Sequence, residues 1–249
     1  MLLQLCTWQE VEAYLRRSSG TIIPIGSTEQ HGPNGLIGTD AICPETIARG
    51  VAVEVDTMVV PTISIGMAQH HLGFPGSITL RPSTLLSMIK DVVNSLANHG
   101  FDRFYFLNGH GGNIATVNAA FSELYAESSL GTASHNRPRL RCKLVNWWAG
   151  EGVKKLSQEL FGDAEGSHAT PGEVSLSYFA YPNAVKTVKM SPEIAPTGEI
   201  YDARDYRQRF PDGRIGSNPS LASIEAGEKL YKAAVADVAN DYRKFLTAE

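Results

Sequence analysis

Cysteine is scarce in this 249-residue sequence, and the three that occur, Cys6, Cys43 and Cys142, lie far apart with no Cys-x-x-Cys pair. We therefore expect neither a disulfide framework nor a thiolate zinc site, and a reducing compartment fits this cysteine usage. No apolar run approaches the ~18–20 residues that a membrane-spanning helix needs. The first residues also lack the charged leader and long apolar stretch of a signal peptide, so we expect a cytoplasmic protein without membrane association.

An excess of charge of one sign is also missing, since 22 Lys and Arg face 26 Asp and Glu for a formal net charge of −4. Such a balance supplies no basic face large enough to dominate nucleic-acid binding. The 43% hydrophobic and 19% charged fractions are ordinary for a globular chain and exclude a disordered one. The length predicts one domain over residues 1–249, with an irregular loop or flap near residues 191–219, where Pro and Gly are frequent.

Short β-branched or apolar runs alternate with longer helical patterns over the first 150 residues. Helices are expected after the capping box that opens at Thr7 and over residues 41–53, 81–99, 114–128 and 220–246, and strands over residues 21–25, 58–65, 103–107 and 139–147. Residues 174–181 fit either a strand or a helix. The alternation predicts a mostly parallel sheet covered by helices on both faces.

Polar and imidazole side chains follow the predicted strands at their carboxyl ends, where ligands collect in parallel sheets. The first such loop holds Glu29 and His31, with Asp40 nine residues after His31. Two carboxylates and an imidazole suit divalent Zn, Mn or Fe, and a carboxylate such as Asp40 can bridge two ions. The alternatives are a helix-capping Asp40, a surface Glu29 and a hydrogen-bonded His31 in a turn.

A second loop, residues 108–113, places His110 among glycines that allow a close approach of the backbone. A ligand histidine there would point into the crevice above the sheet. The rival interpretation is a phosphate cradle at a helix N-terminus. No Lys-Ser or Lys-Thr follows the loop, and the Gly-x-Gly-x-x-Gly spacing of dinucleotide-binding proteins is absent.

Two further segments carry histidines. His168 and Glu173 are separated by a Pro-Gly turn and could ligate a metal or move protons, although a structural turn is the alternative. Of the adjacent His70 and His71, at most one is expected to face the site. Ser27 lacks the Gly-x-Ser-x-Gly elbow, so nucleophilic serine chemistry finds little support.

Several of these segments, in this order, resemble the creatininase (creatinine amidohydrolase) family. The resemblance covers nearly the whole chain and is carried by Pro24-Ile-Gly-Ser-Thr-Glu-Gln-His-Gly32 with Gly38-Thr-Asp40, His71-Leu-Gly-Phe-Pro-Gly76, Asn108-Gly-His-Gly-Gly-Asn113 and the pair His168 and Glu173. It implies a metal-dependent hydrolase of C–N amide bonds, built as a three-layer α/β/α sandwich with a mostly parallel central sheet. It also implies a homo-oligomer, often a hexamer, and a small amide or peptide-like substrate.

The resemblance also implies a ligand set for two divalent ions per subunit, zinc first, with manganese or iron as alternatives. Glu29, Asp40 and His110 match the ligands of one ion, and His31 and Asp40 match those of the second. Two departures stand out, because creatininase has glutamates where this chain has Gly112 and Ser167. Glu173 is our candidate for the missing ligand.

These departures argue against creatinine as the substrate. They favour the broader branch of the family, which includes formamide deformylases of flavin biosynthesis and the peptidase that trims the mycofactocin precursor. In the mechanism we expect, the ions activate a water molecule, Glu173 acts as its general base and His168 protonates the departing nitrogen. His71, Trp147 and Trp148 are expected to wall the substrate pocket, with packing in the core as the alternative for the two tryptophans. A non-catalytic module or a nucleotide-binding module in the same crevice remains the alternative.

Overall fold

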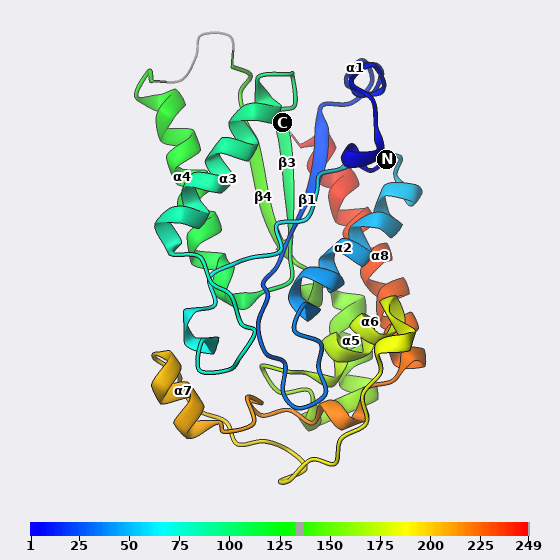
Figure 1. Cartoon of the computed structure of the whole chain (residues 1–249). Coiled ribbons are helices and arrows are strands. Elements are labelled where there is room, and N and C mark those ends of the chain that lie inside the picture. The colour runs from blue at the N-terminus through cyan, green and yellow to red at the C-terminus, as the bar shows by residue number, and fades with distance from the viewer. Residues whose placement is uncertain (133–136, 249) are drawn as a thin grey trace.

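The computed structural model describes residues 1–132 and 137–248 and is built on a parallel sheet of four strands (Figure 1). The strands are β1 (Gly20–Ile25), β2 (Met58–Val59), β3 (Arg103–Asn108) and β4 (Arg141–Asn146), in the order β2-β1-β3-β4. All neighbouring pairs are parallel, and Ile25 pairs with Asn108, which pairs with Asn146. The three longer strands therefore end at the same level, so the loops that leave them share one edge.

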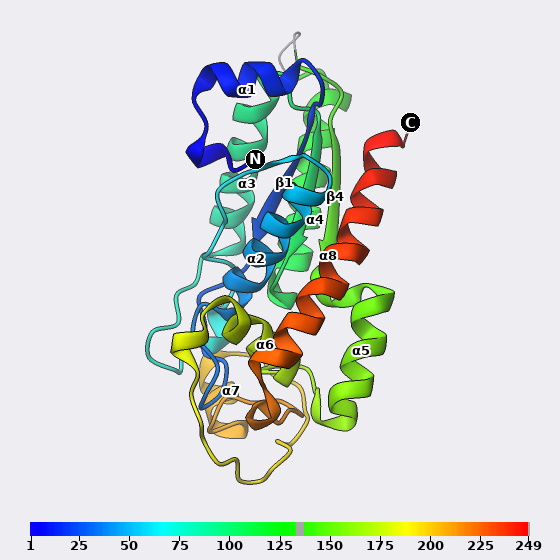
Figure 2. The same cartoon turned by 90° about the vertical axis from the view of Figure 1, so that its right-hand side faces the viewer.

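Helices cover both faces of this sheet (Figure 2). One layer contains α1 (Trp8–Leu15), α3 (Pro82–Ala97) and α4 (Ile114–Ser129); the other contains α2 (Thr39–Glu54), α5 (Glu151–Phe161), α6 (Pro171–Ala180) and α8 (Ile224–Thr247). The three-layer α/β/α sandwich with a parallel central sheet is thus confirmed. No helix within the described residues is long and apolar enough to cross a bilayer.

Alternate residues of the strands belong to two separate cores. Ile23 and Phe106 pack with α3 and α4, whereas Ile22, Tyr105 and Leu107 pack with α2 and α8. Successive side chains of a strand point to opposite faces, so helices on both sides of the sheet bury all of β1 and all of β3 except Arg103. This explains why the sequence of β1 and β3 is apolar without alternation.

Some element predictions were wrong. The strand expected over residues 58–65 is only β2, because Pro61 has no N–H to donate to a ladder and only an isolated bridge joins Ile63 to Ile25. Asp40 does not cap α2, whose N-cap is Gly38; it lies in the first turn. Residues 174–181 belong to helix α6, and helix α5 was not predicted at all.

The segment over residues 191–219 is mostly irregular, as expected, but it contains the short helix α7 (Ala203–Arg209). The segment lies beyond the carboxyl ends of the strands, at the bottom of Figure 1. The buried guanidinium of Arg214 holds it together by donating to the carbonyls of Pro192, Glu193 and Ser217. These bonds keep an irregular chain in a defined place over the site.

Candidate metal centre

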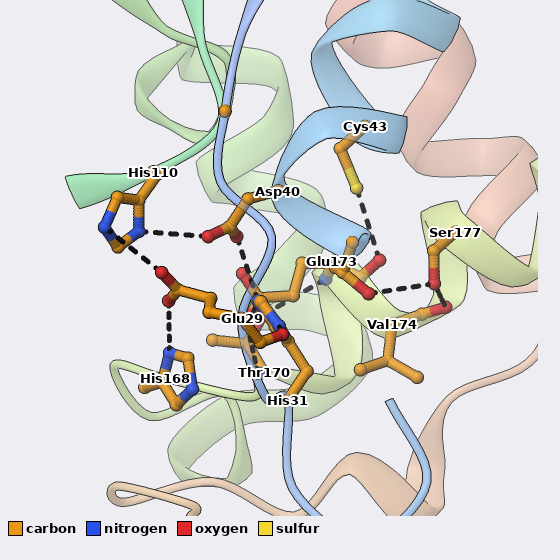
Figure 3. A network of polar contacts seen from close by, with 12 residues as sticks. Glu29, His31, Asp40, Cys43, His110, His168, Thr170, Glu173, Val174 and Ser177 are labelled. Atoms are coloured by element: carbon orange, nitrogen blue, oxygen red, sulfur yellow. Dashed lines mark hydrogen bonds and ion pairs between the residues drawn. The ribbon is translucent and has the colours of Figure 1, made fainter. Parts of the chain in front are cut away.

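Acidic and imidazole side chains from four segments meet at the carboxyl edge of the sheet (Figure 3). Glu29 and His31 come from the loop after β1, Asp40 from the first turn of α2, His110 from the loop after β3, and Glu173 from the start of α6. All five are largely or fully buried. The structure thus brings together the five side chains for which the sequence predicted metal binding.

Asp40 lies between two histidines. Its Oδ1 is 2.9 Å from His31 Nε2, and its Oδ2 is 3.0 Å from His110 Nδ1. Burial would raise the pKa of Asp40, but the adjacent His31 and His110 outweigh it and hold that pKa well below the usual range. The first turn of a helix also favours an anion. Asp40 is therefore a carboxylate whose two oxygens face two different imidazoles.

Glu29 is fully buried and surrounded by imidazoles. Its Oε2 lies 3.3 Å from His110 Nε2, and its Oε1 lies 2.9 Å from His71 Nε2. Burial raises the pKa of Glu29. Despite these short distances, neither oxygen of Glu29 nor Oδ2 of Asp40 has a hydrogen bond in well-aligned geometry within the described residues. Buried carboxylate oxygens without partners are costly, and they call for a cation.

The spacing of these atoms fits a metal ion. Two ligands of a tetrahedral ion with bonds of ~2.1 Å lie ~3.4 Å apart, so the contacts of 2.9–3.0 Å around Asp40 would have to open only slightly. Three groups have ligand atoms that all lie within 4.8 Å of one another: Glu29, Asp40 and His110; His31, Asp40 and Glu173; and Glu29, His31 and His168. The first two share Asp40, so the residues fit a pair of ions with Asp40 between them.

Backbone carbonyls orient both imidazoles. His31 Nδ1 is 3.0 Å from the carbonyl of Glu29, and His110 Nε2 is 3.0 Å from that of Met67. A ring N–H that donates to a carbonyl leaves the other nitrogen free for a metal, as is usual for ligand histidines. Burial would lower the pKa of both rings, but the nearby carboxylates outweigh burial. They raise the pKa of His31 to about 10 and that of His110 to about 9.

The loop after β3 fixes His110 through its own side chains. Asn108 accepts a hydrogen bond from the backbone N–H of His110 and donates to its carbonyl. A Cβ at Gly112 would lie 2.4 Å from His110 Nε2. Gly112, where creatininase has a glutamate, therefore leaves room for the imidazole of His110 in its present position.

Glu173 and His168 stand on two sides of this cluster. Glu173 Oε1 accepts the backbone N–H of Thr170 in a capping box and lies 3.9 Å from His31 Nε2. Burial raises the pKa of Glu173 to about 7 and lowers the pKa of His168 well below its usual value. His168 Nε2 is 2.9 Å from the carbonyl of Gln30, and its Nδ1 faces Glu29 at 3.9 Å.

Gln30 is a connecting residue that sequence reasoning missed. Its amide nitrogen lies 3.0 Å from His71 Nδ1 and 2.9 Å from the carbonyl of Gly213, and its oxygen accepts the N–H of Gly32. It thereby joins the loop after β1 to His71 and to the segment over residues 191–219. The sequence signal that could have identified Gln30 was its position between the two predicted ligands Glu29 and His31.

Two cavities open beside the cluster. The tryptophan cavity, about 480 Å³, is lined by the cluster residues Asp40, His110, His168 and Glu173 and further by Trp147, Trp148, Lys154, Ser157, Gln158 and Glu165 among others. The tyrosine cavity, about 460 Å³, lies against His110 and His168 and is lined further by His70, His71, Glu199, Ile200, Tyr201 and Tyr206 among others.

The three predicted pocket residues are thus divided between the cavities. Trp147 is buried and Trp148 half-buried in the tryptophan cavity, whereas His71 lines the tyrosine cavity beside the half-buried His70. Lys154, Gln158 and Glu165 were not predicted. Lys154 and Gln158 belong to the unpredicted helix α5, and Glu165 precedes the His168 segment.

The fold and the cluster together define a class of protein. It is an α/β/α sandwich in which carboxylate and imidazole side chains suited to metal binding meet at the carboxyl edge of a parallel sheet. The sequence profile of the creatininase family, described as creatinine amidohydrolase, matches residues 4–241. The chain therefore belongs to the creatininase family of hydrolases.

Curated relatives support this assignment. Creatinine amidohydrolase of Pseudomonas putida is 26% identical over 256 aligned positions, covering 96% of this chain and 94% of that protein. Mycofactocin precursor peptide peptidase of Mycolicibacterium smegmatis is 33% identical over 230 positions, covering 90% and 84%. A 3-dehydro-scyllo-inosose hydrolase of Thermotoga maritima is 33% identical over 109 positions, covering 43% and 35%.

Solved structures agree with the fold. A creatininase mutant complexed with creatine has a TM-score of 0.84 at 25% identity, covering 99% of both chains. A Zn–Zn form of a creatininase mutant has a TM-score of 0.82 at 25% identity, covering 99% of this chain and 98% of that one. A manganese form of creatininase has a TM-score of 0.83 at 24% identity, covering 99% of both, and shares the fold.

Proposed function

We propose that the protein is a metal-dependent amidohydrolase that cleaves a C–N amide bond with a water molecule activated by two divalent ions. The observation that carries this proposal is the set of buried carboxylate oxygens, on Glu29 and Asp40, that lack hydrogen bonds within the described residues and face imidazole nitrogens. Glu29, Asp40 and His110 would hold one ion, and His31, Asp40 and Glu173 the other.

When bound, a divalent ion pair supplies Lewis acidity, lowering the pKa of water from 15.7 toward ~7 and polarising the amide carbonyl. The chain's own contribution begins with charge. Glu29, Asp40 and Glu173 would offset three of four positive charges, so the site keeps a net attraction for hydroxide and for a developing oxyanion. Zinc is our first choice of metal, with manganese or iron as alternatives, because mixed oxygen and nitrogen ligands accept all three.

His168 and Glu173 are the residues we assign to proton transfer. Glu173 would take the proton from water, since its carboxylate lies beside the ligand cluster, 3.9 Å from His31 Nε2. His168 lines both cavities and keeps Nδ1 turned toward Glu29, while its Nε2 lies at the carbonyl of Gln30. Burial keeps the pKa of His168 well below its usual value, so the ring is neutral and Nδ1 is its free nitrogen. Nδ1 would therefore receive the proton that is taken from water and then pass it to the departing nitrogen.

The substrate is proposed to be an amide other than creatinine. Ser167 and Gly112 stand where creatininase has glutamates, and a peptidase of the mycofactocin precursor is among the relatives at 33% identity. Formamide deformylation and peptide cleavage are both compatible with the site. Assembly as a homo-oligomer, a cytoplasmic location and a single domain over residues 1–249 remain predictions from the sequence.

The decisive experiment is an activity panel of simple amides, formamides and short peptides, assayed after chelation and after readdition of zinc, manganese or iron. We expect hydrolysis of at least one class to disappear with the metal and return with it. The Glu29→Gln variant removes a charge but little volume, and it should lose that activity while staying folded. Activity that persists after complete chelation would contradict the proposal.

A further inference from the structure

The tryptophan cavity and the tyrosine cavity meet at the ligand cluster. Both cavities are lined by His110, Gly111, Ser167 and His168, so this part of the site forms a wall of each cavity. A bond cleaved at the cluster would have room on both sides, about 480 Å³ on one and about 460 Å³ on the other. Each volume alone lies in the range of a complete small-molecule site, ~300–1,000 Å³.

This two-sided space indicates a substrate with a substantial group on each side of the scissile amide. A compact substrate would occupy one cavity and leave the other without function. The tyrosine cavity offers the aromatic rings of Tyr201 and Tyr206 together with Ile200. It is therefore suited to an apolar or aromatic acyl group.

The wall that α5 gives to the tryptophan cavity is rich in hydrogen-bond donors. Lys154, Ser157 and Gln158 have i, i+3 and i+4 spacing, so they share one face of the helix, and all three line the cavity. The apolar face of the same helix packs into the core through Val153 and Leu156. An ammonium, a hydroxyl and an amide on one stripe are a set that suits an anion.

Lys154, an exposed side chain, has no carboxylate partner among the described residues. In the part of the chain that the structure describes, no carboxylate oxygen lies within 4.0 Å of the Lys154 ammonium, whereas the neighbouring Lys155 pairs with Glu159 at 3.9 Å. Three acidic residues also line the cavity: Asp40, Glu165 and Glu173. Asp40 and Glu173 belong to the ligand cluster, and Glu165 Oε2 accepts the backbone N–H of Gly172 in the first turn of α6.

We propose that the substrate is an N-acyl amino acid that lies across both cavities, with its acyl group in the tyrosine cavity and its free carboxylate held by Lys154 and Gln158 in the tryptophan cavity. This inference rests on the proposed amidohydrolase function and specifies its substrate class. Hydrolysis adds water across the amide, so the products are a carboxylic acid and a free amino acid, and no further reactant is needed.

A panel that varies each half of the substrate tests the two-sided fit. N-acetylglycine, N-acetylphenylalanine, N-benzoylglycine and N-benzoylphenylalanine would be assayed with the metal-loaded protein, each as the free acid and as the C-terminal amide. We expect kcat/KM to rise when either half is enlarged and to fall about tenfold when the carboxylate is capped, because the capped substrate loses its charge-assisted contact with Lys154. Equal values for acids and amides would overturn the inference.

Two lysine variants assign the carboxylate contact. Lys154→Met should raise KM for the free acids about tenfold and leave the capped amides unchanged, because only the acids lose an ion pair. Lys155→Met, one residue along the same helix, serves as the matched control and should change neither. Equilibrium binding of N-benzylphenylalanine, which has no amide bond to hydrolyse, to the metal-loaded protein with and without Lys154→Met gives the same comparison without turnover.

The outcomes separate this inference from the function on which it rests. Hydrolysis of capped amides or formamides with no preference for a carboxylate would keep the amidohydrolase and overturn the substrate class. Loss of binding in the Lys155→Met control equal to that of Lys154→Met would also overturn the assignment. Absence of any metal-dependent amide hydrolysis across both panels would contradict the function itself.

Discussion

Asp40 illustrates how single residues create this site. Its carboxylate is buried at the start of α2, and each oxygen lies about 3 Å from a different imidazole. A buried anion without compensation would cost several kcal/mol, and the two nearby imidazoles offset part of that cost in the protein alone. The same arrangement would suit the proposed pair of ions, because Asp40 belongs to two of the groups of candidate ligands.

His110 is the residue whose removal should separate metal binding from folding. In His110→Ala we expect more than about 100-fold weaker binding of one ion, because loss of even an outer partner of a metal ligand costs ~10–100-fold in affinity. Turnover should disappear with it, while circular dichroism should show a folded chain. Elemental analysis of the purified variant measures the retained metal.

His99→Ala provides the matched control, since His99 is an exposed histidine that follows α3. Full metal content and normal turnover in His110→Ala would contradict the ligand role. Reduced metal content in both variants would point to a general effect of histidine loss and would equally contradict it.

At the scale of elements, the sequence predicted best where a pattern is local. The capping box that opens α1 at Thr7 and the apolar runs of β1 and β3 were read from neighbouring residues, and all three elements are present. Helix α5 was missed because its apolar stripe is short and follows a strand closely. The strand expected over residues 58–65 was predicted too long. The length of an edge strand depends on its pairing partners and not on the β-branched run itself.

The segment over residues 191–219 depends on a glycine that contacts the site. Gly213 has φ +85°, and a Cβ there would lie 1.9 Å from Gln30 Oε1. Gly213→Ala should therefore lower the free energy of unfolding by about 2–4 kcal/mol, through backbone strain and disturbance of the Gln30 hydrogen bonds. Urea denaturation measures this change.

Gly198→Ala is the control within the same segment. A Cβ at Gly198 would meet only Phe210 Cζ at 3.4 Å, so we expect a change within about 1 kcal/mol. Equal changes in the free energy of unfolding for the two substitutions would contradict the stabilising role of the contact between Gly213 and Gln30.

At the scale of the whole molecule, the order of strands explains why the site could be predicted. Glu29 and His110 were expected to meet because parallel strands end at one edge. Glu173 follows no strand and was assigned to the site by the family resemblance. The sequence could not give the contacts that depend on exact side-chain positions, such as the hydrogen bonds of Gln30. Nor could it separate His71 from Trp147 and Trp148, since the division into two cavities follows from how helices α5 and α7 sit around the cluster.

The charge of the whole cluster predicts how metal binding varies with pH. In the protein without metal, the pKa of His31 is raised to about 10 and that of His110 to about 9, so both rings are protonated at neutral pH. A metal binds only the neutral ring, so each ion must displace about one proton. Apparent affinity should thus rise about tenfold per pH unit between pH 6.5 and 8.5.

Titration against a competing chelator at pH 6.5, 7.5 and 8.5 measures this dependence. The rise should level off once the solution pH exceeds the raised pKa values. An affinity that is constant above pH 7, as expected for histidines with an ordinary pKa near ~6.5, would show that the carboxylates do not hold those protons.

The most direct test of the metal centre is a crystal structure of the zinc-loaded protein with anomalous diffraction data collected at the zinc absorption edge. The account predicts two anomalous peaks per chain, ~3.5–4 Å apart, with Asp40 bonded to both. It also predicts Glu29 and His110 at the first peak and His31 and Glu173 at the second. A single peak, or peaks away from these side chains, would contradict it.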